Sequence, residues 1–159
     1  MKTIFILTML SLLFLTCNRN VNKELSEEEK ATIISDITRT FEIAGEGITE
    51  LDAEKAFSAF SKKEGTKYIR DGHLYPDIET AKKQYAEWFT SPDAVKRVTT
   101  YDTLIFDILD ENTVLMTSIG SLWVIGDTTG QKPWVIAYTG LWRKEDVSWS
   151  LMNMHNSWE

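Results

Sequence analysis

The chain has 159 residues, of which 43% are hydrophobic and 26% are charged, and its formal net charge is −7. This acidic balance argues against binding to nucleic acid, which needs clustered Lys and Arg, and against adsorption to anionic lipid by charge alone. The only cysteine, Cys17, has no second thiol with which to form an intrachain disulfide, so the hydrophobic core must stabilise the fold.

The N-terminal segment has the composition of an export signal. Lys2 precedes an apolar run over residues 4–15, and Thr16 and Cys17 follow it. A positive start, a short apolar centre and a small residue at the break are typical of a secretory signal, and the run is too short for a stable membrane-spanning helix. We therefore predict a signal peptide over residues 1–16, with a buried N-terminal helix as the alternative.

The end of this run contains a candidate lipidation motif. Residues 14–17, Phe-Leu-Thr-Cys, resemble the lipobox of bacterial lipoproteins. The resemblance implies that Cys17 starts the mature chain and carries lipid, which would anchor it at the bacterial cell envelope, on a periplasmic or outer surface. Without lipid at Cys17, the protein would be secreted. Residues 17–26 are predicted to be a polar tether, and residues 27–159 a single domain.

The domain begins with a helical pattern. Ser26 and Glu29 match a capping box, and apolar residues then recur at helical spacing over residues 33–44. Gly45 and Gly47 follow, and glycine commonly ends helices. The first helix is therefore predicted to stop at these glycines.

Two further helices are expected on either side of a short strand. Asp52 can cap a helix over residues 52–60, and a third helix with one apolar face is expected over residues 77–89. Residues 67–70 suggest a strand that leads into an Asp71-Gly72 turn.

The remainder of the chain is rich in β-branched and aromatic residues. It predicts four consecutive antiparallel strands, over residues 95–108, 113–125, 134–142 and 149–157. Gly120 and Gly140 lie inside these strands, where glycine often marks a bulge or bend. Helices that precede a strand meander indicate an α+β fold with the helices on one face of the sheet.

This order of elements resembles the nuclear transport factor 2-like superfamily, which includes polyketide cyclase-like and ketosteroid isomerase-like domains. The most specific part of the resemblance is the last hairpin, with Trp142-Arg143-Lys144, Asp146, Trp149, Leu151, and His155 with Ser157. The resemblance spans residues 27–158 and implies a cone-shaped, curved antiparallel sheet with N-terminal helices packed on its concave face. It transfers no activity, because the superfamily includes isomerases, dehydratases, cyclases and non-catalytic members.

The last strand contains the main candidate for chemistry, His155. Strand parity places it on the same side as Asn153, Trp149, Leu151 and Ser157. If that side is concave, His155 could be a general base or a polar anchor, and Asn153 could contact a ligand. Otherwise His155 would hydrogen-bond a neighbouring strand or lie in a dimer interface. Parity alone does not identify the inner face.

Asp71 is the second candidate base. Asp-Gly is mainly a turn signal, and no second acid is clearly paired with Asp71. The resemblance implies another possible role, because isomerase-like relatives place a catalytic carboxylate at the pocket mouth.

Aromatic residues supply the candidate ligand contacts. The chain has six tryptophans, an excess that could line an amphipathic pocket or fill the core and a dimer interface. Our candidates for the pocket are Tyr68, Trp88, Trp123 and Tyr138, together with Asn153 and His155.

Three hypotheses follow from these features. The first is a lipid-anchored, exported binding domain that holds a small organic ligand in an aromatic-lined cone without catalysis. The second is an isomerase, dehydratase or hydrolase that uses His155 or Asp71 as base. The third is a homodimeric assembly module. No cofactor and no metal are expected, because two separated histidines and a lone cysteine give no zinc spacing. The expected partners are a small molecule, the membrane through Cys17 and a second copy of the chain.

Overall fold

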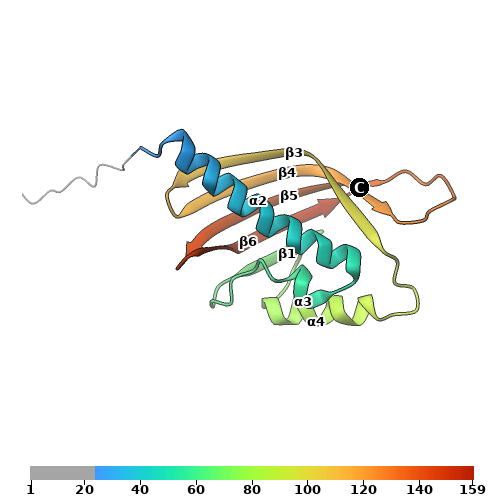
Figure 1. Ribbon diagram of the computed structural model, residues 1–159. Helices are drawn as coiled ribbons and strands as arrows, with labels where there is room; N and C mark the ends of the chain where they lie inside the picture. The colour runs from blue at the N-terminus through green and yellow to red at the C-terminus, as the bar shows by residue number, and fades with distance from the viewer. Residues whose placement is uncertain (1–23) are drawn as a thin grey trace, which may run out of the picture.

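The computed structural model describes residues 24–159, which form helices packed against one curved, open sheet (Figure 1). The signal peptide predicted over residues 1–16, the lipidation site at Cys17 and most of the tether predicted over residues 17–26 lie outside the described residues. Among the described helices, none combines the length and apolar character needed to cross a membrane. The predicted α+β fold, with its helices ahead of the strand meander, is confirmed.

The long helix α2 (Glu27–Glu50) begins at the predicted capping box. The Ser26 hydroxyl accepts a hydrogen bond from the Glu29 amide at 3.2 Å, and the Glu29 carboxylate accepts one from the Ser26 amide at 2.8 Å. The predicted end at Gly45 and Gly47 is wrong, because the helix continues through both glycines. Leu51, with a φ of 61°, caps it instead.

Gly47 has a packing role. It faces the one-turn helix α3 (Ala53–Ala56), which Asp52 caps by accepting a hydrogen bond from the Lys55 amide at 3.0 Å. A Cβ atom at Gly47 would lie 2.2 Å from the backbone nitrogen of Ala56. Glycine therefore lets the backbones of α2 and α3 approach closely, and α3 is shorter than the predicted helix over residues 52–60.

The short strands β1 (Lys67–Arg70) and β2 (His73–Leu74) and the helix α4 (Ile78–Phe89) come next. The predicted turn between the two strands is confirmed, with Asp71 and Gly72 at φ angles of 49° and 79°. Asp77 caps α4 by accepting a hydrogen bond from the Thr80 amide at 2.7 Å. The buried face of α4 consists of Ala81, Tyr85 and Phe89.

Four long strands complete the sheet: β3 (Arg97–Asp110), β4 (Thr113–Val124), β5 (Trp134–Glu145) and β6 (Ser148–Trp158). They are consecutive and antiparallel, as predicted. The sequence did not predict how the short strand β1 pairs. In the structure, β1 lies parallel to β6. The strand order is β2-β1-β6-β5-β4-β3, so β1 and β3 lie near opposite edges of the sheet.

Irregular pairing accompanies both glycines of the sheet. The register between β3 and β4 shifts between Tyr101 and Thr103, opposite Gly120, where a Cβ atom would lie 2.1 Å from a carbonyl oxygen of β3. Gly140 lies next to a second shift, between β5 and β6. A bulge therefore lies opposite Gly120 and another close to Gly140, and in each case the extra residue belongs to the partner strand, residue 102 of β3 and residue 152 of β6. Such bulges bend strands.

The core lies between α2 and the concave face of the sheet, which α2 crosses diagonally (Figure 1). Phe41 of α2 contacts the rings of Tyr101, Tyr138 and Trp142, with centroid separations of 5.0, 5.7 and 6.3 Å. Trp142 is fully buried and Trp149 nearly so. These two tryptophans of the last hairpin therefore belong to the core.

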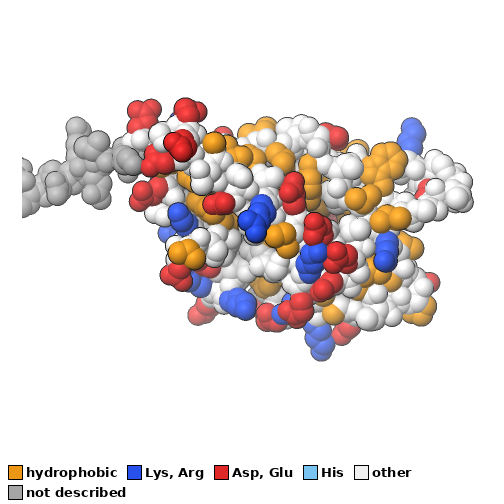
Figure 2. All heavy atoms as spheres, viewed as in Figure 1, with side chains coloured by type: hydrophobic (Ala, Val, Ile, Leu, Met, Phe, Trp, Pro, Cys, Tyr) orange, Lys and Arg blue, Asp and Glu red, His pale blue; other side chains and the backbone are white. Residues whose placement is uncertain are grey.

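The surface seen in Figure 2 carries interspersed acidic and basic side chains. Glu27, Glu28 and Glu29 cluster at the start of α2, where the helix dipole favours negative charge. Several lysines at the surface are paired with carboxylates, as the half-buried Lys55 is with Glu46 at 2.7 Å. Arg97, described below, has no such carboxylate partner among the described residues.

Candidate functional site

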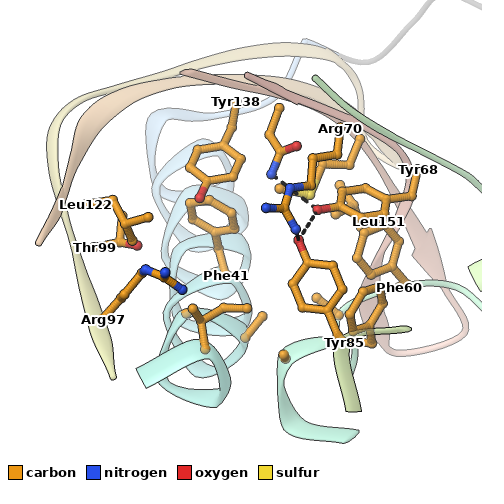
Figure 3. Close-up of a pocket in the computed structure, with 18 of the residues that line it drawn as sticks. Phe41, Phe60, Tyr68, Arg70, Tyr85, Arg97, Thr99, Leu122, Tyr138 and Leu151 are labelled. Atoms are coloured by element: carbon orange, nitrogen blue, oxygen red, sulfur yellow. Dashed lines mark hydrogen bonds between the residues drawn. The ribbon is translucent and has the colours of Figure 1, made fainter. Parts of the chain in front are cut away.

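A cavity lies between the concave face of the sheet and the helices (Figure 3). Helices α2, α3 and α4, the turn after α3, and strands β1, β3, β4, β5 and β6 all contribute to its lining. Its volume is about 80 Å³, well below the roughly 300–1,000 Å³ of pockets for drug-sized ligands. The lining residues are Phe41, Ala44, Gly45, Ile48, Ala56, Phe57, Ala59, Phe60, Tyr68, Arg70, Tyr85, Trp88, Arg97, Thr99, Tyr101, Leu122, Tyr138, Leu151, Met154, Asn156 and Trp158.

The lining changes in polarity from base to rim. Buried apolar side chains such as Phe57 and Leu151 form the inner part, with 7% and 2% of their surface exposed. Arg70 keeps 22% of its side chain exposed and Trp158 is 36% exposed. The cavity thus has an apolar interior and a cationic, aromatic rim.

A hydrogen-bonded network crosses one wall (Figure 3). The hydroxyls of Tyr68 and Tyr85 are 2.7 Å apart, and Arg70 Nη1 donates to the Tyr85 hydroxyl at 2.9 Å. Asn156 Nδ2 donates to the Tyr68 hydroxyl at 3.2 Å. Polar contacts inside the cavity therefore join strands β1 and β6 to helix α4.

The network leaves hydrogen-bonding capacity unused. The two phenols have two protons, and the hydrogen bond between them uses one. Each phenol oxygen also accepts a bond, Tyr68 from Asn156 and Tyr85 from Arg70, so the second phenol proton has no partner in the described chain. Asn156 Oδ1 is buried and has no hydrogen-bond partner in the described part of the chain. At least one donor and one acceptor of this network thus remain for a ligand, and a buried acceptor without a partner is costly.

The tyrosines of the cavity remain protonated at neutral pH. Burial raises the pKa of Tyr68 well above its usual value, and the neighbouring Tyr85 raises it further. Burial likewise raises the pKa of Tyr85, Tyr101 and Tyr138. These phenols can donate hydrogen bonds, but they are poorly suited to act as bases.

Two arginines reach toward the same space from opposite walls (Figure 3). The Arg97 guanidinium carbon lies 4.6 Å from the ring centroid of Trp88 and 5.6 Å from that of Trp134. The Arg70 carbon lies 4.0 Å from the ring centroid of Trp158 and 6.0 Å from that of Trp88. Burial, and then the positive charge of Arg70, lower the pKa of Arg97. Curvature of the sheet brings these residues of β1 and β3 to face each other.

No protein-family model and no curated protein sequence matches this chain. Solved structures do match. A protein from Novosphingobium aromaticivorans, provisionally named a scytalone dehydratase, superposes with a TM-score of 0.69 at 12% identity over 84% of this chain and 89% of that chain. A Streptomyces avermitilis protein, provisionally named a dehydratase of the NTF2-like family, gives 0.66 at 13% identity over 82% and 98%. An NTF2-like protein of unknown function from Shewanella oneidensis gives 0.63 at 16% identity over 79% and 98%.

The chain has the nuclear transport factor 2-like fold. The predicted architecture, a curved sheet with N-terminal helices on its concave face, is confirmed, and the sheet is open with one parallel pair, β1 and β6. Identities of 12–16% establish the fold alone, so the chemistry has to be argued from the side chains that this fold positions.

The nuclear transport factor 2-like fold brings three of the six predicted ligand-contact residues together. Tyr68, Trp88 and Tyr138 lie on the cavity wall. Trp123 lies on the outer face of β4, beside Val98 of β3, and is 45% exposed. Asn153 and His155 are also exposed and do not line the cavity.

The placement of Asn153 and His155 corrects the parity argument for the last strand. The register of β6 against β5 shifts by one residue, because Trp142 pairs with Leu151 whereas Leu141 pairs with Asn153. Residue 152 is the extra residue of this bulge. Trp149 and Leu151 therefore face inward. After the bulge the odd-numbered residues lie on the other side of the strand, so residues 153, 155 and 157 face outward. A one-residue slip exchanges the two faces of a strand.

Asp71, the second candidate base, lies in the turn after β1 and outside the cavity lining. Its carboxylate accepts a hydrogen bond from the Trp158 amide at 3.2 Å and lies 3.6 Å from Arg70 Nε. In this position Asp71 connects the β1 turn to the end of β6 and partly balances the charge of Arg70.

Sequence reasoning missed Arg70, Arg97 and Asn156 as cavity residues. Arg70 lies two residues after Tyr68 on the same strand, so strand parity carried a usable signal for it. Asn156 faces inward only because of the bulge at residue 152. Arg97 reaches the cavity through the curvature of the sheet, for which the sequence offers no local signal.

Proposed function

We propose that this protein is an exported, lipid-anchored binding domain that holds a small organic ligand in the concave cavity. The observation that carries the proposal is the lining itself. Its interior is aromatic and aliphatic, and it carries few polar groups: Tyr68, Tyr85 and Asn156 form a network on one wall, and Arg97 lies on the opposite wall. Such a combination is typical of sites that bury an apolar body and orient it through a few hydrogen bonds.

Binding is favoured over catalysis because the cavity lacks a side chain suited to abstract a proton. Among the described residues that line it, none is Asp, Glu, His or Cys. An isomerase or dehydratase needs a general base in reach of its substrate. The names of two structural neighbours favour such an enzyme as the alternative, yet His155 and Asp71 do not line this cavity.

Native mass spectrometry of the protein purified from its own host tests the binding proposal. We expect a small molecule that dissociates on unfolding and whose mass does not change on prolonged incubation with the protein. Conversion of the bound molecule would favour the enzyme alternative. A chain that is always empty, including after exposure to extracts of its host, would contradict the proposal.

The lipid anchor is proposed from the Phe-Leu-Thr-Cys motif at residues 14–17. Cells fed a radiolabelled fatty acid should incorporate label into the wild-type protein, whereas Cys17→Ala should carry none and should leave the membrane fraction. The change removes only the proposed attachment atom, so residues 27–159 should be unaffected. Label that persists in Cys17→Ala would refute the anchor.

A homodimer is the second candidate assignment, supported by apolar residues on the outer face of the sheet. Ile105, Ile119, Trp123 and Val135, on the adjacent strands β3, β4 and β5, are between 45% and 54% exposed. Contiguous exposed apolar surface often marks an interface. Sedimentation analysis should give a dimer that Ile119→Glu converts to a monomer. A wild-type monomer at all concentrations would exclude this assembly.

A further inference from the structure

The charges at the cavity rim point to a chemical class of ligand. The chain is acidic overall, yet the described cavity lining contains two arginines and no carboxylate. Arg70 has Asp71 at 3.6 Å as a partial counter-charge. Arg97 has no described carboxylate partner, and its Nη1 is buried without a hydrogen bond. The rim therefore has an uncompensated positive charge, which is costly to keep in a partly buried place.

The position of the two guanidinium groups over tryptophan rings suits an anion. Each lies over a tryptophan ring, Arg97 at 4.6 Å from Trp88 and Arg70 at 4.0 Å from Trp158. Stacking occupies the faces of a guanidinium and leaves the N–H groups at its edge free to donate. Arg70 donates one N–H to the Tyr85 hydroxyl, and Arg97 Nη1 has no hydrogen-bond partner in the described chain. Donors thus remain available on both sides of the rim.

The size and polarity of the interior restrict the rest of the ligand. The cavity of about 80 Å³ admits a compact body, and Phe57, Phe60 and Leu151 make the interior apolar. Asp71 offsets part of the positive charge, so a singly charged anion balances the rim better than a doubly charged phosphate ester. Planar carboxylates also match the N–H geometry of arginine.

We propose that Arg70 and Arg97 clamp the carboxylate of a small organic acid whose aromatic or branched apolar body enters the cavity. This inference rests on the proposed binding function and adds the ligand class to it. Tyr68, Tyr85 and Asn156 then supply the donor and acceptor that orient polar substituents on the body.

Benzoate and its neutral analogue benzamide test the clamp by calorimetric titration of the full-length protein in non-ionic detergent. Benzoate should bind one molecule per chain, at least about tenfold more tightly than benzamide, because hydrogen bonds to charged groups are the stronger ones. Its affinity should fall as salt is added. Arg97→Gln should weaken benzoate binding about tenfold or more and leave benzamide unaffected. Arg97→Lys, which keeps the charge, should recover part of the loss.

Arg143→Gln is the matched control, because Arg143 is exposed on β5 and does not line the cavity; it should bind benzoate like the wild type. Thermal unfolding of each variant establishes that it is folded. Equal affinities for the two probes, no effect of Arg97→Gln, tighter binding of phenyl phosphate than of benzoate, or binding of neither probe would each overturn the clamp. The binding function is judged separately, by the host-derived ligand in native mass spectrometry.

Discussion

Replacing Gly47 by Ala should destabilise the protein by about 3 kcal/mol, although the same change in an exposed helix stabilises by about 1 kcal/mol. The added Cβ would lie 2.2 Å from Ala56 N, 2.6 Å from Ala56 Cα and 2.6 Å from Lys55 C. All three are backbone atoms, so no side-chain rotation relieves the contact, and α2 and α3 must separate. Urea unfolding monitored by circular dichroism measures the change in the free energy of unfolding.

Gly45→Ala is the control for the Gly47 prediction. Gly45 lies in the same helix, but a Cβ there would approach only the Tyr101 hydroxyl, at 3.3 Å. This tip of a side chain can shift by a few tenths of an ångström, so the free energy of unfolding should change by less than about 1 kcal/mol. If Gly47→Ala were as stable as Gly45→Ala, the close approach of α2 and α3 would be refuted.

Replacing Ala44 by Phe should abolish benzoate binding. Ala44 lines the cavity from α2, and the benzyl group of Phe would occupy the space into which the ring of benzoate is expected to enter. The variant retains Arg70 and Arg97, so loss of binding would show that the apolar interior is required in addition to the rim charges. Calorimetric titration measures the affinity, and native mass spectrometry measures loss of any host-derived ligand.

Ile43→Phe is the matched control for Ala44→Phe. Ile43 is the preceding residue of α2, is 38% exposed and does not line the cavity, so the same aromatic side chain should leave benzoate binding unchanged. Both variants should unfold at temperatures close to that of the wild type, because Ile43 is exposed and the Phe ring at position 44 enters an existing cavity. Wild-type affinity in a folded Ala44→Phe protein would place the ligand elsewhere.

Features that depend on local sequence were predictable. The capping box at Ser26 and Glu29, the turn at Asp71-Gly72 and the four C-terminal strands each depend on residues close together in the chain. Together with the order of the elements, these signals were sufficient to predict the nuclear transport factor 2-like fold.

Features that depend on distant contacts were not predictable. Gly47 has the usual signature of a helix end, but its reason for being glycine is the backbone of Ala56, on another helix. The alternation of β6 is interrupted at residue 152, where the register against β5 shifts. A sequence read at period two therefore groups His155 with Trp149 and Leu151, whereas the structure places it on the opposite face from them.

The candidate site was predicted only in its aromatic part. Tyr68, Trp88 and Tyr138 were identified because large aromatic residues are natural pocket linings. The rim arginines come from opposite sides of the sheet and meet only through its curvature. The positive charge of the site, from Arg70 and Arg97, is therefore known only from the structure. This charge is the reason why we propose an organic acid as the ligand and not an unspecified small molecule.

The measurement that tests the central claim most directly is nuclear magnetic resonance of the isotope-labelled protein during titration with benzoate. Resonances of the inner-face residues Trp88, Asn156 and Trp158 should shift together and saturate, while the indole signal of the outer-face residue Trp123 and the imidazole signals of His155 stay unchanged. Shifts confined to Trp123 and His155, or no saturable shift on the inner face, would contradict the assignment of the concave cavity as the ligand site.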